Sequence, residues 1–255
     1  MSGHSKWQQI RRKKAVTDAR RGKAFTQVIK EITIAAKLGG GDPGGNPRLR
    51  LAIEKAKAAN MPADNIKRAI MKGTGELPGM SYEDAVYEAY GPGGVALIIE
   101  CVTDNKTRTV NEIRHILDRN HGKLAATGAV AYQFHRKGIL TVPKSAISEN
   151  DLMAIVLEAG AEDFKTEEEH FSISTTPEDY EKVLQALQQK NLPVEHSELQ
   201  LVPETSVKIE GKEAEQVLKL VEALEELDDS QQVYSNFEID DAVIALFQSG
   251  EEQSG

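Results

Sequence analysis

The chain has 255 residues, of which 40% are hydrophobic and 28% are charged, enough for two or three domains with their own cores. Its longest uninterrupted aliphatic run, Val95 to Ile99, is too short to cross a bilayer, so we expect a soluble cytoplasmic protein. The one cysteine, Cys101, excludes an internal disulfide and a cysteine metal cluster, and its apolar neighbours predict a buried structural thiol.

Charge is distributed very unevenly along the chain. The net charge is -9, yet residues 1–75 hold 17 Lys and Arg against 5 Asp and Glu, whereas residues 76–255 hold 14 against 35. The cations are densest over residues 4–30, where Asp18 is the one acid. Such a basic segment predicts an anionic polymer as partner, with nucleic acid as the first candidate. The alternative is a solvated helix face, which usually mixes both signs of charge.

Residues 1–77 are expected to form a basic helical domain. Residues 4–22 are predicted to be a flexible arm that orders on binding, and a helix begins near residue 23. Its apolar residues recur at helical spacing until the glycines at 39–41 end it. Asn46 followed by Pro47 predicts the start of a second helix, and a third follows the break at Pro62. The cations lie outside the apolar stripes of these helices.

The rest of the chain is predicted to be α/β. Residues 78–136 together with 204–247 should form a discontinuous middle domain, and residues 137–203 should be inserted within it. The inserted segment has the order strand, helix, strand, strand, helix, strand, which is that of the ferredoxin-like fold. Residues 248–255 are expected to be a flexible tail. The predicted class is therefore α+β, with a helical N-terminal domain and two α/β domains.

Three shorter patterns lie in the middle domain. Residues 91–94, Gly-Pro-Gly-Gly, join two predicted strands and lack the Lys-Ser/Thr of a P-loop, so they predict a hairpin turn rather than a phosphate cradle. Asp104 or Asn105 is predicted to start the next helix, in which Thr109 and Glu112 have the spacing of a capping box. Residues 129–134 have the apolar character of a strand.

No pattern of residues predicts catalysis. The six histidines show no pair at the spacing of a helical zinc site, and no motif marks an activated nucleophile. We therefore expect a protein that is not an enzyme, with no catalytic residue, no metal site and no cofactor.

The predicted nucleic-acid-binding residues are cations of the basic domain, together with the chain's one tryptophan. Lysine and arginine neutralise phosphates without reading sequence. Trp7 either stacks on a base or sugar or covers the apolar face of the first helix. Base readout would need amide side chains, for which Gln8, Gln9, Gln27, Asn60 and Asn65 are candidates. The predicted binding set is Lys6, Trp7, Arg11, Arg12, Lys13, Lys14, Arg20, Arg21, Lys23, Lys30, Arg48, Arg50, Lys67, Arg68 and Lys72.

Six motifs, taken together, resemble the YebC/PmpR family across essentially the whole chain. They are GHSKW at 3–7, RRGKAFT at 20–26, GGGDPGGNPRLRLAI at 39–53, NMPADNIKRAI at 60–70, YGPGG at 90–94 and AVAYQF at 129–134. The resemblance implies three domains arranged around a cleft. It also implies a cytoplasmic DNA-binding transcriptional regulator, although a mitochondrial relative activates translation and bacterial members are linked to helping ribosomes through proline-rich stretches.

From the residues and the resemblance we expect a non-enzymatic regulator that binds DNA through its basic domain. The alternative is a translation factor that binds ribosomal RNA, with the ribosome as partner. We do not expect a membrane partner, and we expect the protein to be a monomer.

Overall fold

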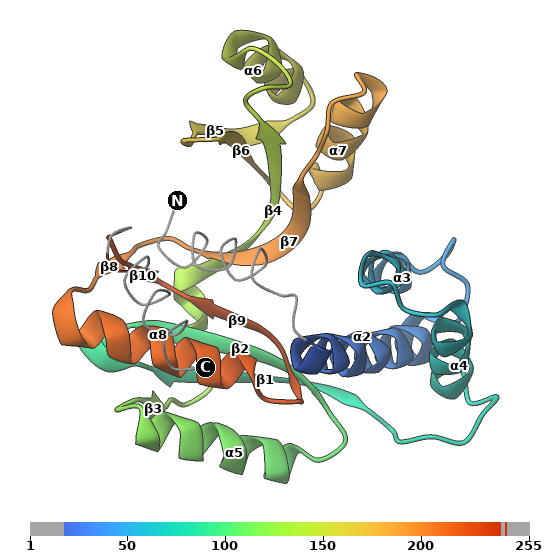
Figure 1. The fold of residues 1–255 in the computed structure, drawn as a ribbon, viewed down its shortest axis with the longest axis vertical. Helices are drawn as coiled ribbons and strands as arrows, with labels where there is room; N and C mark the ends of the chain where they lie inside the picture. The colour runs from blue at the N-terminus through green and yellow to red at the C-terminus, as the bar shows by residue number, and fades with distance from the viewer. Residues whose placement is uncertain (1–17, 241–242, 244–255) are drawn as a thin grey trace. The chain divides into compact units, whose positions relative to one another are not determined.

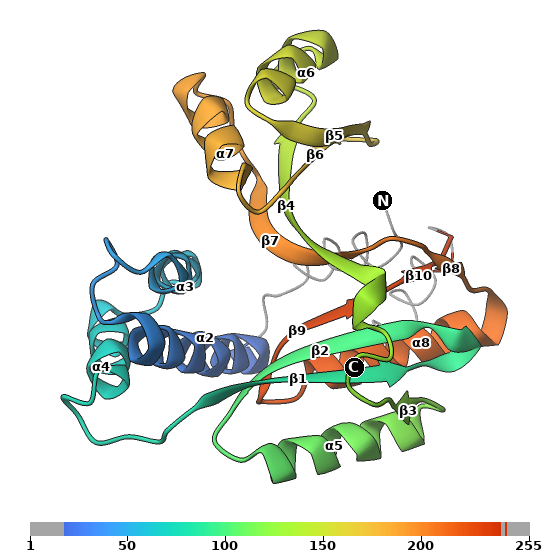
Figure 2. The ribbon, with the colours of Figure 1, turned by 180° about the vertical axis from the view of Figure 1, so that it is seen from behind.

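The computed structural model describes residues 18–240 and 243 of the chain. The chain divides into two compact units, one of Met1–Ala131 with Thr205–Gly255 and the other of Tyr132–Glu204. Figures 1 and 2 show both from opposite sides. The α+β class is confirmed, with a ferredoxin-like unit inserted into a sheet domain. The first unit holds both the three helices and the middle sheet, so a domain boundary at residue 77 stays a prediction.

Three helices follow one another in the first unit, as predicted: α2 (Asp18–Gly39), α3 (Pro47–Ala58) and α4 (Ala63–Gly73). The start of α2 was placed wrongly, because residues 18–22 are helical rather than part of a flexible arm. The middle of α2 lies on the sheet, where Gln27 Nε2 donates to Ser230 O at 2.6 Å. This non-local contact stabilises the helix against repulsion among its cations. The remainder of the predicted arm and the predicted tail lie outside the described residues.

Asn46 joins α2 to α3. Its Oδ1 accepts the backbone N–H of Leu49 at 3.1 Å and caps α3, as the sequence predicts. Its Nδ2 donates to Ala35 O at 2.8 Å and to Gly40 O at 2.9 Å, at the end of α2. The helices share an apolar core that includes Ile32, Ala35, Leu49, Ala52 and Ala69.

The middle sheet has the order β3-β1-β2-β9, and all its neighbouring strands are antiparallel. Its strands are β1 (Glu83–Tyr90), β2 (Ala96–Thr103), β3 (Lys123–Leu124) and β9 (Ser230–Ser235). Helices α5 (Lys106–Arg119) and α8 (Gly211–Glu225) pack on one face, where Leu97, Ile99, Ile113 and Leu220 are buried in one cluster. A small parallel pair, β8 (Val207–Lys208) with β10 (Phe237–Glu238), completes this part. Strand β9 of the C-terminal segment thus pairs with β2 and completes the sheet that β1, β2 and β3 begin.

Of the three shorter patterns, the hairpin and the helix start at Asn105 are confirmed, whereas the capping box at Thr109 and the strand over residues 129–134 are wrong. The turn between β1 and β2 contains the 3-10 segment η1 (Pro92–Gly94). Asn105 caps α5, which is one of the two predicted starts, whereas Thr109 does not cap a helix and is fully buried one turn further on. Residues 129–133 do not form a strand, because a bend and the 3-10 segment η2 (Ala131–Gln133) come first, and the next strand begins only at Phe134.

Glu88 is the reason that residues 128–131 form a turn. Its buried carboxylate accepts the backbone N–H groups of Gly128, Val130 and Ala131, the last two at 2.7 and 2.9 Å. Burial alone would raise the pKa of Glu88, but these three hydrogen bonds outweigh it and lower the pKa. The backbone donors that a strand would use are therefore taken by one side chain.

The second unit is a ferredoxin-like β-α-β-β-α-β fold, as predicted. Its sheet has the order β5-β6-β4-β7, with every neighbouring pair antiparallel. Both helices contribute to one core with Leu140, Val156, Ile173 and Val183. The elements are β4 (Phe134–Pro143), α6 (Glu149–Glu158), β5 (Ala161–Thr166), β6 (His170–Thr175), α7 (Tyr180–Gln189) and β7 (His196–Pro203). Across the described ranges of both units, no helix combines the length and the apolar character that a membrane span requires.

Candidate nucleic-acid interface

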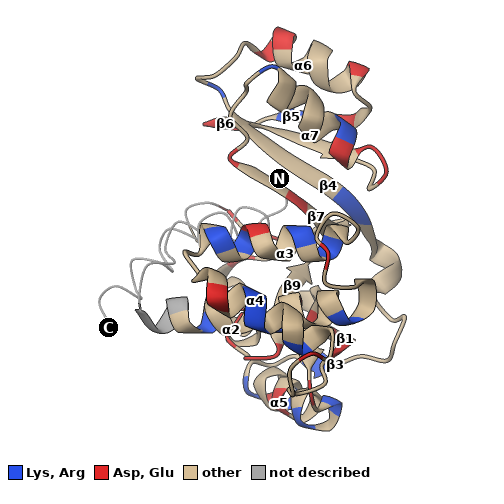
Figure 3. Cartoon of the chain, turned by 90° about the vertical axis from the view of Figure 1, so that its right-hand side faces the viewer, with Lys and Arg blue, Asp and Glu red and all other residues tan. Residues whose placement is uncertain are grey.

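Helices α3 and α4 present cations on the sides that face away from their shared core. Leu49, Ala52 and Ala56 bury one side of α3, and Ile66 and Ala69 bury one side of α4. Lysines and arginines occupy other positions of both helices, as the blue segments in Figure 3 show. The apolar stripe thus fixes which positions remain for charged side chains.

Four predicted binding residues on these helices carry no carboxylate partner within the described part of the chain. Lys67, Arg68 and Lys72 of α4 are exposed, and Arg50 of α3 is half-buried. Arg68 and Lys72 are four residues apart and therefore lie on one side of α4. Lys57, two turns after Arg50, is exposed in the same way and was missing from the predicted set. We call Arg50, Lys57, Lys67, Arg68 and Lys72 the free cations.

Arg48 is held by two carboxylates. Its Nε and Nη2 donate to Glu31 at 2.7 and 3.0 Å, and its Nη1 and Nη2 donate to Asp84 at 2.8 Å each. The hydrogen bonds to Asp84 and then to Glu31 raise the pKa of the guanidinium. Arg48 thereby connects α3 to both α2 and β1. A phosphate could bind this arginine only by displacing a carboxylate.

Lys30 is buried rather than presented to solvent. Its Nζ lies 2.6 Å from Asp229 Oδ1 and 2.8 Å from Asp228 O, and the residue is 7% exposed. Asp229 Oδ2 in turn accepts from Thr103, Arg108 and Thr109 at 3.0, 2.7 and 2.7 Å. We call these five residues the Asp229 cluster. Lys30 fastens α2 to the sheet and has no surface from which to contact a phosphate.

Asp229 remains ionised at the centre of this cluster. Burial alone would raise the pKa of its carboxyl group, but the hydrogen bonds from Lys30, Thr109 and Arg108 outweigh burial and lower the pKa to about 2. Sequence reasoning missed the cluster, because Asp229 follows a helix far along the chain from Lys30.

The other predicted binding residues lie at or before the beginning of α2. Lys23 is half-buried, and Arg20 and Arg21 belong to α2. Lys6, Trp7, Arg11, Arg12, Lys13 and Lys14 lie outside the described residues.

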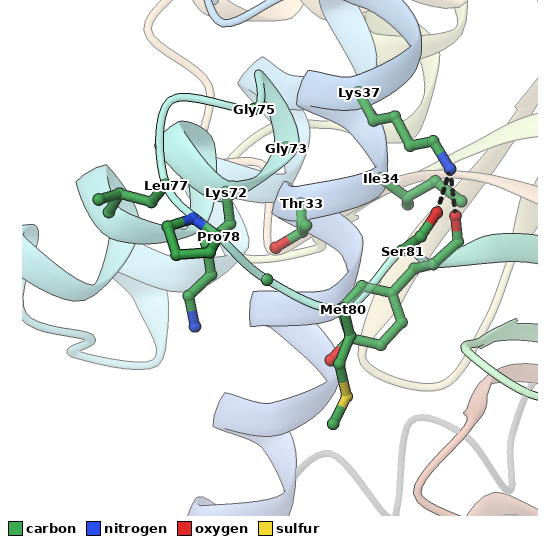
Figure 4. A pocket seen from close by; sticks show the side chains of 12 residues that line it. Thr33, Ile34, Lys37, Lys72, Gly73, Gly75, Leu77, Pro78, Met80 and Ser81 are labelled. Carbon is green, nitrogen blue, oxygen red and sulfur yellow. Dashed lines mark hydrogen bonds between the residues drawn. The ribbon is translucent and has the colours of Figure 1, made fainter.

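A pocket of about 330 Å³ adjoins the free cations of α4. It lies between α2, α4 and the linker, residues 74–82, which connects α4 to β1. Ile34, Leu77 and Met80 contribute apolar walls, and Lys72 lines it from α4. Lys37 Nζ holds the linker by donating to Ser81 Oγ at 2.8 Å and to Tyr82 O at 3.0 Å, as the dashed lines in Figure 4 show. Sequence reasoning missed this pocket, because a linker rich in Gly and Pro carries no binding motif.

Neither metal binding nor thiol chemistry is indicated in the part of the chain that the structure describes. Residues 18–240 contain no group of three or more His, Cys, Asp or Glu side chains placed to hold a metal ion. Cys101 is buried, as predicted, and burial raises the pKa of its thiol to about 12. A thiol with this pKa is not a nucleophile at neutral pH.

Comparison with known proteins covers almost the whole chain. Residues 5–76 match the family model described as the TACO1/YebC protein N-terminal domain, and residues 82–237 match the TACO1/YebC second and third domain. A "probable transcriptional regulatory protein" of Chlorobaculum parvum is 52% identical over 97% of this chain and 99% of its own length. A protein of the same name from Gemmatimonas aurantiaca is 56% identical over 96% and 99%.

A solved structure agrees with this assignment. The crystal structure of a conserved hypothetical protein from Aquifex aeolicus has a TM-score of 0.79 and 48% sequence identity, and the match covers 88% of this chain and 93% of that one. The family resemblance inferred from the six motifs is confirmed: the chain belongs to the TACO1/YebC family.

Proposed function

We propose that the protein is a non-enzymatic regulator in the cytoplasm that binds nucleic acid through its basic domain, with duplex DNA as the leading target. The observation that carries this proposal is the set of free cations on α3 and α4, together with the basic composition of residues 4–30 in the sequence. The printed names of its relatives, probable transcriptional regulatory proteins, support a regulatory role.

The free cations supply binding that depends on charge rather than on sequence. Each lysine or arginine that neutralises a phosphate releases a condensed counterion, so affinity falls steeply with salt. If about six to ten phosphates are contacted, affinity falls about a thousandfold or more between 50 and 200 mM salt. Base readout loses one candidate, because Gln27 is already bonded to Ser230 O.

Filter binding of duplex DNA over a salt series tests the proposal. The combined change Lys67→Gln, Arg68→Gln and Lys72→Gln should lower affinity and reduce the slope of log K against log salt by about three. Lys190→Gln, which removes one exposed charge from the end of α7, serves as the control and should leave both unchanged. Absence of binding even at low salt would refute the proposal for DNA.

The segment before α2 can be tested in the same assay. Replacing Arg11, Arg12, Lys13 and Lys14 with alanine should weaken binding strongly and leave the melting temperature unchanged. A large loss of thermal stability would instead assign these residues a structural role.

A ribosome-associated translation factor is the second candidate. The engagement of Gln27 supports this candidate, because phosphate contacts that carry no sequence information suit ribosomal RNA at least as well as a specific DNA site. Sedimentation of gently lysed cells separates the two candidates. A protein absent from every ribosomal fraction is not this factor.

A further inference from the structure

The pocket beside α4 is a formed feature of the basic domain. Gly73 lets α4 approach α2 closely, since a Cβ there would lie 2.3 Å from Thr33 O. On the linker, Leu77 N donates to Met71 O at 3.0 Å, and Lys37 holds the far end. A Cβ at Gly79 would lie 3.2 Å from the Lys72 side chain, so the aliphatic stem of Lys72 lies along the linker. Contacts among α2, α4 and the linker therefore hold the walls of the pocket in place.

The chemistry of the pocket suits a flat group that has apolar faces and polar edges and is attached to a phosphate. Ile34, Leu77 and Met80 line it with aliphatic carbon and a thioether, and Tyr82 adds the one aromatic ring. Its volume of about 330 Å³ is at the lower end for pockets that hold small organic groups. Lys72 combines a stem at the wall with an ammonium group that has no described partner, and Arg68 lies one turn before it.

We propose that this pocket receives one unpaired base of a bound nucleic acid, whose backbone phosphates lie on Lys72 and Arg68. The inference rests on the proposed function and adds a preference for bulged or looped nucleotides. A base stacked within a duplex cannot enter the pocket, whereas an unpaired base can leave the stack at low cost. The position of Met80, 65% exposed at the pocket wall, is then explained, because its flexible thioether packs against aromatic rings.

The test compares three labelled hairpins by fluorescence anisotropy, each prepared in DNA and in RNA. One hairpin is fully paired, one has a single bulged nucleotide, and one has the same bulge without its base. The wild-type protein should bind the bulged hairpin about tenfold more tightly than the other two, as expected for one base stacked on side chains.

Two matched pairs of variants test whether the pocket causes the preference for the bulged hairpin. Met80→Ala should abolish most of the preference, whereas Leu38→Ala should preserve it, because both side chains are 65% exposed and only Met80 lines the pocket. Lys72→Gln should weaken binding of the bulged hairpin more than Lys57→Gln does, since both variants remove one exposed lysine charge.

The outcomes separate this inference from the proposed function. If all hairpins bind equally, or if Met80→Ala keeps the full preference, the pocket inference is overturned and the proposed function stands. If no hairpin binds at low salt, both fail.

Discussion

Replacing Asp229 with alanine should destabilise the first compact unit by about 3–5 kcal/mol, the usual cost of removing one partner from a buried ion pair. Lys30 Nζ would keep only the carbonyl of Asp228, and its buried charge would lose a carboxylate 2.6 Å away. Thr103 and Thr109 would lose an acceptor in a site where Asp229 is 1% exposed.

The pKa of Asp229 predicts how this contribution depends on pH. The folded-state value of about 2 lies below the ordinary value of 3.8, so ionisation of Asp229 stabilises the fold by about 2 kcal/mol at neutral pH. This contribution is fully present above the unfolded-state pKa and is lost as the pH falls from about 4 to about 2. The difference in the free energy of unfolding between wild type and Asp229→Ala should therefore become smaller over that pH range.

Urea unfolding followed by circular dichroism at pH 7 measures the effect. The two compact units allow two transitions, and only the one that belongs to the first unit should move. Glu210→Gln is the control, since its pair with Lys208 at 2.8 Å is exposed on both sides and should leave the midpoint unchanged. A variant that replaces both partners with apolar residues, Lys30→Met with Asp229→Leu, should recover much of the loss. If Asp229→Ala unfolds at the same urea concentration as Glu210→Gln, the Asp229 cluster does not stabilise the fold as argued.

Three further predictions concern the other polar anchors of the first unit. Asp84→Asn should raise affinity for duplex DNA about two- to fivefold by removing one of the two carboxylates that compete with phosphate for Arg48, and anisotropy should find no such gain when Arg48→Met is also present. Glu88→Gln should lower stability by about 1–3 kcal/mol, because an amide cannot accept all three backbone N–H groups; a thermal melt like that of wild type would contradict this. Asn46→Ala should cost about 1–3 kcal/mol and speed hydrogen exchange in α3, whereas unchanged protection there would show that the cap is dispensable.

The fold was largely predictable because its signals are local. The start of α3 at Asn46 and Pro47 depends on a few adjacent residues, and the inserted unit is recognisable from the order of its elements. The errors arose where a distant side chain decides the local structure. Thr109 has capping-box spacing but is bound by Asp229, and residues 129–134 read as a strand until Glu88 is placed beside them.

The sequence predicted that the candidate site consists of cations of the basic domain, but not which of these cations are free. Charge density identified the basic domain, and helical spacing correctly left Lys67, Arg68 and Lys72 outside the core. The same criteria could not separate them from Lys30 and Arg48, whose carboxylate partners Asp229 and Asp84 come later in the chain. Which cations are free is decided by tertiary contacts, and a single sequence does not encode these as a pattern.

The two ends of the inserted unit lie side by side, and this affects the order in which the sheets fold during synthesis. Phe134 pairs with Pro203, and Glu204 N donates to Gln133 O at 2.8 Å, so the insertion begins and ends at adjacent points. All of its strands are made consecutively, whereas β2 must wait for β9 on the far side of the insertion. Once the insertion has folded, it closes a long loop and leaves a short one for β9 to bridge, which lowers the entropic cost of completing the middle sheet. Folding of the insertion on the nascent chain can therefore lower the entropic cost of pairing β9 with β2 before β9 has been translated.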